Sequence, residues 1–224
     1  MTVGLYDVLL LAHVLLFVYW LGADLAVLYS ARYVADPGLS LETRATISQI
    51  MAFVDLFPRM SVPLIGAVGA TLGVMTADFN FGVPVLALIW TLALIWVTLN
   101  GWLYAHRGDA LRTAPWRRFD VAWRSVIGTA VLVAGLAALA GFGITDNRSL
   151  ALKLLIFAAA IFLSLVLRRV FLPFRPALRR LADGTGGHAD VVLMQRTLSR
   201  TRPIVLGIWA LTVMAAALGL WQPF

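Results

Sequence analysis

Residues 9–29 read LLLAHVLLFVYWLGADLAVLY, and this stretch decides the class of the fold. The run is apolar and long enough for a helix that crosses a lipid bilayer, which takes about 20 residues. His13, Trp20 and Asp24 follow one another at spacings of seven and four residues. A helix places all three on one face, because two turns take about 7 residues. Since ionisable groups are costly inside a membrane, we expect this face to point into the protein and to mark a functional site.

The composition places the whole chain among membrane proteins. Hydrophobic residues make up 61% of the 224 residues and charged residues only 13%, whereas soluble domains carry about 25% charged residues. The formal net charge is +7, but the basic residues fall between apolar runs, so we expect membrane lipid as a partner and no nucleic acid. The chain has no cysteine, which excludes disulfides, thiolate metal sites and thiol catalysis.

Six apolar runs predict an all-α bundle of six transmembrane helices in a single domain, residues 1–224. No cleavable signal peptide is expected, because no positively charged region precedes the first run. In segment 187–202 apolar residues alternate with arginines, which predicts either a short interfacial helix or a solvated basic loop. The predicted spans lie near residues 5–30, 50–75, 83–105, 122–142, 150–172 and 204–221.

The distribution of arginine predicts the orientation of the bundle. The joints after the first, third and fifth spans carry most of the arginines, whereas those after the second and fourth carry only Arg148 and Lys153. Positively charged loops stay in the cytoplasm. Both termini are therefore predicted to lie outside, on the periplasmic side if the membrane is a bacterial inner membrane.

The second span carries a charged pair at helical spacing. Asp55 and Arg59 are four residues apart, with Pro58 and Pro63 on either side of Arg59, so the two charges share a face and a kinked helix is expected. The sequence leaves two partners open for Arg59, namely Asp55 and Asp24. Such a pair could shape a cavity wall or only hold the first two spans together.

Two polar layers follow from the predicted orientation. The outer layer contains His13 and Lys153, and Lys153 either meets a group bound at His13 or extends to the interface. The inner layer contains Asp24, Asp55, Arg59 and Asn100. His106 lies at the membrane edge beside Arg107, so it is either an interfacial side chain or a second, weaker candidate for a metal or haem ligand.

A buried imidazole and nearby cations in an apolar bundle suit a porphyrin. Neutral imidazole ligates haem iron, and arginine or lysine pairs with propionates. A copper site is a second interpretation, although the methionines show no close repeat. A proton or ion path through Asp24, Asp55 and Arg59 is a third.

The segment AHVLLFVYWLGADLAVLYSARY, residues 12–33, resembles the first helix of HemJ-type protoporphyrinogen oxidases and of the related CopD-like copper-resistance proteins. The helix with Arg59 is similar to the family's arginine-bearing second helix. SLALKLLIFAAAIFLSLVLRR, residues 149–169, is similar to its lysine-bearing helix, and RTRPIVLGIWALTVMAAALGLW, residues 200–221, to its closing helix. The chain departs from the pattern by two extra spans between the arginine and lysine helices, and by Asp24.

The resemblance implies a haem b protein that oxidises protoporphyrinogen or transfers electrons to a quinone or a redox partner protein. It implies His13 as the ligand of the haem iron, with Trp20, Arg59 and Lys153 around the cofactor. Arg59, Lys153 and Asp24 are the candidate catalytic residues. A CopD-like copper-handling protein and a non-enzymatic membrane subunit are the alternatives.

Overall fold

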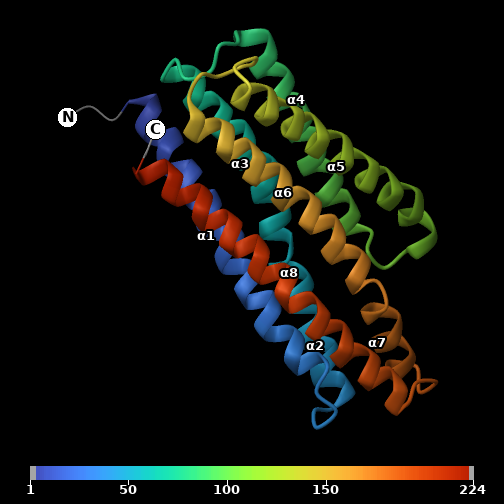
Figure 1. Ribbon diagram of the computed structural model, residues 1–224. Helices are drawn as coiled ribbons and strands as arrows, with labels where there is room; N and C mark the ends of the chain where they lie inside the picture. Colours follow the sequence, from blue (N-terminus) through green and yellow to red (C-terminus); the bar gives the residue numbers. More distant parts are fainter. Residues whose placement is uncertain (1–3, 222–224) are drawn as a thin grey trace.

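The structure is a computed structural model, and it describes residues 4–221. Within this range every regular element is an α-helix (Figure 1). The helices are α1 (Leu5–Val34), α2 (Leu41–Val54), α3 (Leu56–Met75), α4 (Val83–Ala105), α5 (Ala110–Leu139), α6 (Arg148–Phe171), α7 (Phe174–Ala182) and α8 (His188–Trp221).

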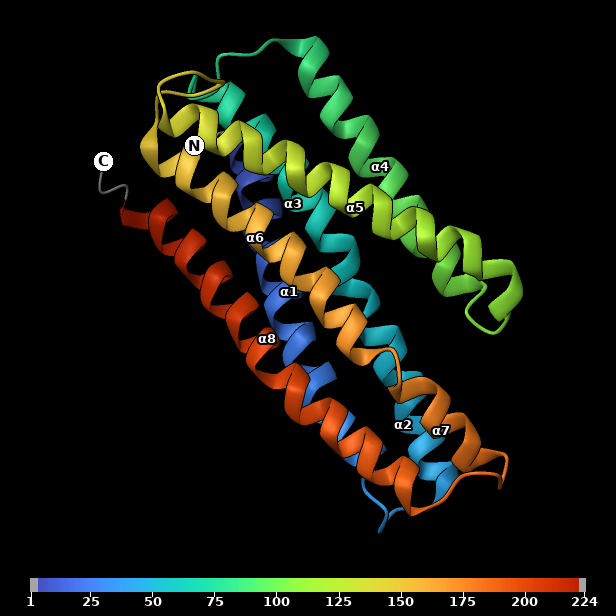
Figure 2. The ribbon, with the colours of Figure 1, turned by 45° about the vertical axis from the view of Figure 1, so that its right-hand side comes forward.

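The six predicted spans are confirmed as six helical stretches that are long and apolar enough to cross a membrane, within the part of the chain described. α2 continues into α3 and α6 into α7, so each of these pairs forms one stretch. α1 begins and α8 ends at the same end of an elongated bundle (Figures 1 and 2). A chain that crosses a membrane six times returns to the side from which it started, so the start of α1 and the end of α8 must lie at the same end. By this architecture the molecule is a multi-pass membrane protein.

Two helices begin much earlier than the apolar runs indicate. α5 begins at Ala110 rather than near residue 122. The Asp109 side chain accepts a hydrogen bond from the backbone N–H of Arg112 at 2.9 Å, and this N-cap starts the helix before the apolar run. Likewise, α2 begins at Leu41 after the N-cap Ser40 rather than near residue 50. Hydropathy detects the apolar part of a helix and misses its polar extension.

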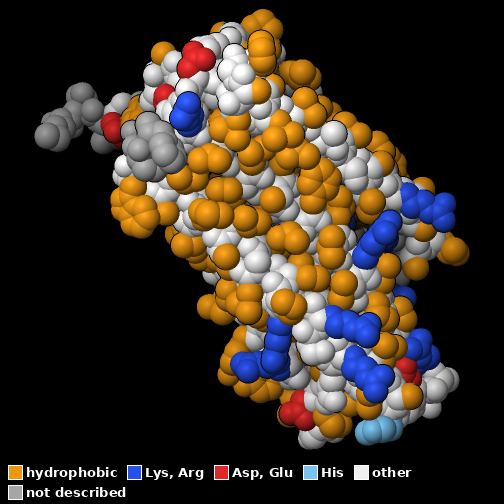
Figure 3. Space-filling model, in the orientation of Figure 1, with side chains coloured by type: hydrophobic (Ala, Val, Ile, Leu, Met, Phe, Trp, Pro, Cys, Tyr) orange, Lys and Arg blue, Asp and Glu red, His pale blue; other side chains and the backbone are white. Residues whose placement is uncertain are grey.

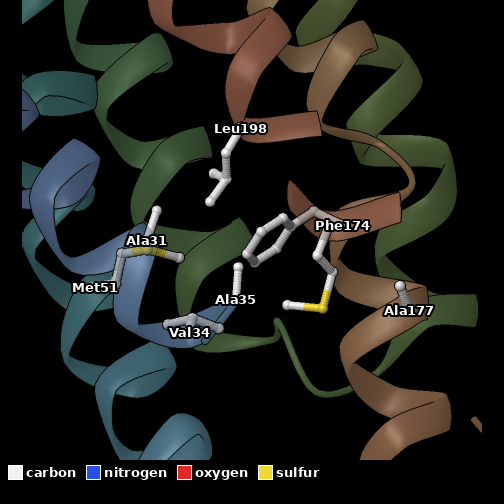
Figure 4. Close-up of a cluster of buried hydrophobic side chains, with 8 residues drawn as sticks. Ala31, Val34, Ala35, Met51, Phe174, Ala177 and Leu198 are labelled. Carbon is white, nitrogen blue, oxygen red and sulfur yellow. The ribbon is translucent and has the colours of Figure 1, made fainter. Parts of the chain in front are cut away.

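Segment 187–202 is helical, but it is neither a separate interfacial helix nor a loop. It forms the first half of α8, which runs without interruption through Pro203. The face with Met194 and Leu198 packs against Phe174 and Ala177 of α7 (Figure 4). The amphipathic pattern thus reflects burial against a neighbouring helix.

This hydrophobic cluster holds four helices together at the arginine-rich end of the bundle. It brings together Ala31, Val34 and Ala35 at the end of α1, Met51 of α2, and the residues of α7 and α8 just named (Figure 4). The buried Arg44 side chain donates from Nε to the backbone oxygen of Val34 at 2.8 Å. This bond satisfies a carbonyl in the last turn of α1, where intrahelical donors are missing.

On the face shown in Figure 3, apolar side chains cover the side of the bundle, whereas charged side chains gather toward the two ends. Large hydrophobic residues such as Leu11, Val18, Leu88 and Val126 are exposed. A soluble protein does not expose such a surface, since contiguous apolar patches there are rarely larger than a few hundred Å². The exposed apolar belt is the surface that lipid chains cover.

Close packing of α5 on α6 depends on a glycine. A Cβ atom added at Gly135 would lie 2.8 Å from Cδ2 of Leu155 and 3.2 Å from the backbone oxygen of Ala151. The absence of a side chain lets the two helices approach, as small residues do in membrane bundles. Gly22 of α1, by contrast, has nothing within 4 Å of such a position.

We therefore expect Gly135→Ala to destabilise the protein by about 1–3 kcal/mol, the usual cost of overpacking. Gly22→Ala is the matched control and is not expected to lower stability, because alanine favours the helix. Thermal unfolding in detergent compares the variants. Equal melting temperatures would show that α5 and α6 do not pack as described.

The loops at the end opposite the arginine-rich one are joined by polar contacts. Asn147 donates from Nδ2 to Oδ1 of Asp78 at 3.0 Å, and Thr76 donates from Oγ1 to Oδ2 at 2.5 Å. The hydroxyl of Thr76 and the amide of Asn147 lower the pKa of the Asp78 carboxyl below its usual value. Asn147 also caps α6 by accepting from the N–H of Leu150, so the Asp78 carboxylate ties the α3–α4 loop to the start of α6.

Asp78→Ala should lower the free energy of unfolding by about 1–3 kcal/mol at neutral pH, because it removes two bonds to a charged acceptor. A lowered pKa in the folded state means that this stabilisation is complete above about pH 4 and is lost as the pH falls through the folded-state pKa. Melting temperatures of both proteins, measured from about pH 7 down to about pH 3, should therefore converge in acid. A gap that stayed constant would contradict the role of the carboxylate.

Candidate functional site

His13 of α1 lies directly against α3. A Cβ atom at Gly69 would lie 3.0 Å from Cε1 of His13 and less than 4 Å from both ring nitrogens. The Nδ1 atom of His13 is buried and has no hydrogen-bond partner within residues 4–221. A buried imidazole nitrogen normally has a partner, because leaving it without one costs free energy. The unpaired Nδ1 therefore leaves His13 with an unused hydrogen-bonding position within the described residues.

Lys153 of α6 belongs to the same end of the bundle as His13, in agreement with the predicted outer layer. Its Nζ atom lies 3.2 Å from the position that a Cβ would take at Gly219 of α8. Its charge is close enough to act on both His13 and Asp78. No carboxylate among the described residues forms an ion pair with Lys153. The lysine is therefore available to an anionic group near His13.

Trp20 lies between the two polar layers. Only 7% of it is exposed, and it packs with Val62, Ala160 and Ile208 in a cluster that joins α1, α3, α6 and α8. Its ring meets Phe157 edge-on, with centroids 6.4 Å apart. The predicted face of α1 does point inward, but at Trp20 this face meets packed apolar side chains.

At the opposite end of the bundle, Arg59 forms an ion pair with Asp55. Of the two partners that the sequence leaves open, the structure selects this one, at i and i+4 on the turn that joins α2 to α3. Asp24 of α1 is partly buried and lies close enough for its charge to act on Asp55 and Arg59. It forms no ion pair with any residue in the described range.

Asn100 of α4 connects Arg59 to a second group of charges. Its Nδ2 donates to the backbone oxygen of Arg59 at 2.9 Å. That oxygen lacks its intrahelical partner because Pro63 has no N–H. Oδ1 of Asn100 accepts a hydrogen bond from Nη2 of Arg124 at 3.1 Å. The side-chain amide of Asn100 thus pairs with the unpaired carbonyl in α3 and also positions Arg124 of α5.

Asp120 is the centre of this second group. The carboxylate has no exposed surface, and it accepts from Nε of Arg124 at 3.0 Å and from Arg168 of α6. The guanidinium of Arg124 also lies over the ring of Trp96, 4.9 Å from its centroid. The resulting chain of contacts runs through α3, α4, α5 and α6. No prediction from the sequence includes this chain of contacts, although Asp120 and Arg124 stand at the same i and i+4 spacing as Asp55 and Arg59.

The candidate residues therefore fall into two separate sites. His13 faces α3 at Gly69, ten residues from Arg59 on the same helix, a separation of about 15 Å at about 1.5 Å per residue. His13 and Lys153 lie at one end, and Asp24, Asp55 and Arg59 lie at the other. Arg59 does not contact a small group held directly by His13.

His106 lies apart from His13 as well. It ends α4, where its ring stacks on Trp102 with centroids 4.4 Å apart. Its Nδ1 lies 3.0 Å from the backbone oxygen of Trp102, within hydrogen-bond distance. Within residues 4–221, no group of three or more His, Cys, Asp or Glu side chains is placed to hold a metal ion. These contacts explain His106 as a C-terminal helix residue.

Comparison with models of known protein families, with curated proteins and with solved structures finds no match to this chain.

The buried charges generate a prediction about stability. Asp120→Asn leaves Arg124 and Arg168 without a counter-ion, and breaking a buried ion pair costs about 3–5 kcal/mol. Asp183→Asn makes the same chemical change at an exposed position at the end of α7 and should have little effect. Melting temperatures in detergent compare the two variants, and similar values would refute a central role for Asp120.

Proposed function

We propose that this chain is a haem b or porphyrin-binding redox protein of the bacterial inner membrane, in which His13 would hold the iron. The unpaired, buried Nδ1 of His13 carries the proposal. A neutral imidazole uses one nitrogen for the metal and the other for a hydrogen bond, so a ring without a hydrogen-bonded Nδ1 has capacity for a ligand.

The surroundings of His13 fit such a group in two respects. The absence of a side chain at Gly69 lets the imidazole lie against α3, which fixes the position of the ring. Lys153, which has no ion-pair partner among the described residues, would pair with a propionate at the same end of the bundle. When bound, haem iron supplies the capacity to take up and release a single electron. The protein's part is to ligate the iron, to neutralise a propionate and to exclude water.

Two reactions are open to such a site, namely oxidation of a porphyrinogen and electron transfer to a quinone or a partner protein. Arg59 and Asp24 belong to the other end of the bundle, so we assign them no contact with the reacting group at His13. Copper as the alternative cofactor draws no support from a donor cluster in residues 4–221. A purely structural membrane subunit is the other alternative, and it assigns no ligand to the His13 nitrogen.

The visible absorption spectrum tests the proposal. Protein expressed with ample haem supply and purified in detergent should show a Soret band, and α and β bands after reduction with dithionite. His13→Ala should lose them, because the imidazole that would hold the iron is gone. His106→Ala is the matched control and should keep the spectrum, since His106 lies at the far end of α4. Gly69→Ala, which would crowd the ring, should weaken or shift the bands.

A colourless wild-type protein would overturn the haem proposal. A spectrum that His13→Ala leaves unchanged would overturn the assignment of the ligand. Melting temperatures of all three variants show whether a lost spectrum reflects the site or the fold.

A further inference from the structure

A small cleft opens at the arginine-rich end of the bundle, where α2 and α3, α4, α5, α6 and α7 meet. Its walls include five arginines and only one carboxylate, namely Arg59, Arg107, Arg117, Arg168, Arg175 and Asp55. Two of the arginines have counter-ions, Arg59 in Asp55 and Arg168 in Asp120. The charge within the cleft is therefore strongly positive.

Three arginines of the cleft form no ion pair with any described residue. Arg107 donates from Nη1 to the backbone oxygen of Tyr104 at 3.0 Å and lies over the Tyr104 ring, 4.1 Å from its centroid. Arg117 donates from Nε to Oγ1 of Thr113 at 3.2 Å. These contacts hold the guanidinium groups in position without neutralising them. Arg175 of α7 has neither kind of contact in the described range.

Arg168 supplies an independent sign of a missing partner. Its Nη1 donates a hydrogen bond to Oδ2 of Asp120, but its Nη2 is buried and has no hydrogen-bond partner within residues 4–221. A buried guanidinium N–H without an acceptor is costly, more so than a neutral donor. The Arg168 side chain lines the cleft, and an anion bound there would supply the missing hydrogen-bond acceptor for its Nη2.

The size of the cleft limits what it holds. Its free volume is about 40 Å³, and one water needs roughly 10–15 Å³ of such volume. The space therefore accepts a group of a few heavy atoms and excludes a porphyrin or a nucleotide base. Several guanidinium groups around a small volume match the many acceptor oxygens of a tetrahedral oxyanion better than a single carboxylate.

We propose that this cleft binds a phosphate group. Retention of positive loops in the cytoplasm accounts for arginines at this end, but not for a cleft lined by them or for the unpaired Nη2 of Arg168. The phosphate comes either from a soluble phosphate compound or from the headgroup of an anionic phospholipid. The site is separate from His13 and does not depend on haem.

Full-length protein in nanodiscs of neutral phosphatidylcholine allows binding of radiolabelled inorganic phosphate to be measured by equilibrium dialysis. The double variant Arg117→Gln with Arg175→Gln removes two exposed cations that form no ion pair, so it should fold normally. It should weaken phosphate binding by about tenfold or more, since charge-assisted hydrogen bonds are each worth that much. Arg118→Gln, the neighbouring exposed arginine outside the cleft, is the matched control and should bind as the wild type.

A second arm identifies the source of the phosphate group. Protein purified with phosphatidylglycerol and phosphatidylcholine is examined by native mass spectrometry. If a lipid headgroup fills the cleft, wild type and Arg118→Gln should retain phosphatidylglycerol selectively, and the double variant should lose it. A soluble phosphate ligand instead gives dialysis binding without lipid selectivity. If neither arm distinguishes the double variant from Arg118→Gln, the proposal is wrong.

Discussion

The carboxylate of Asp120, shared between Arg124 and Arg168, is the interaction on which the arginine-rich half of the bundle depends. It lies on α5, has no contact with solvent, and neutralises an arginine of its own helix and one of α6. Charges inside an apolar bundle are stable only when they are paired and hydrogen-bonded. This pairing therefore fixes the register of α5 against α6, and Asn100 extends the constraint to α3 and α4 through Arg124 and the carbonyl of Arg59.

The same constraint explains why the two ends of the molecule differ. At the arginine-rich end Asp55 and Asp120 neutralise some of the arginines, whereas Arg107, Arg117 and Arg175, which form no ion pair with a described residue, line a small cleft. At the other end a single imidazole lies against the backbone of α3, with an unpaired nitrogen and a lysine nearby. Packed aromatic and aliphatic side chains around Trp20 and Trp96 separate the two. The buried ion pairs thus lie at one end of the bundle, and the site proposed for the cofactor lies at the other.

The sequence alone predicts the number of spans, the inward face of α1, the shared helical face of Asp55 and Arg59, and the common end of His13 and Lys153. All of these follow from hydropathy and helical periodicity, which act within one helix or along the membrane normal. Asn100 as a bridge and Asp120 as a shared counter-ion depend on contacts between helices. No periodicity encodes them, although the spacing of Asp120 and Arg124 signals one half of the group. The early start of α5 and the continuation of α8 through Pro203 were missed because hydropathy does not detect caps or amphipathic extensions that pack on α7.

The proposed function depends most on what binds the unpaired nitrogen of His13. A pyridine haemochrome assay on the purified protein, set against its concentration, measures this most directly. Equimolar haem b in the wild type, with none in His13→Ala of equal thermal stability, is the result that the account predicts. Wild-type protein that stays free of haem after expression with added δ-aminolevulinate and iron would contradict it.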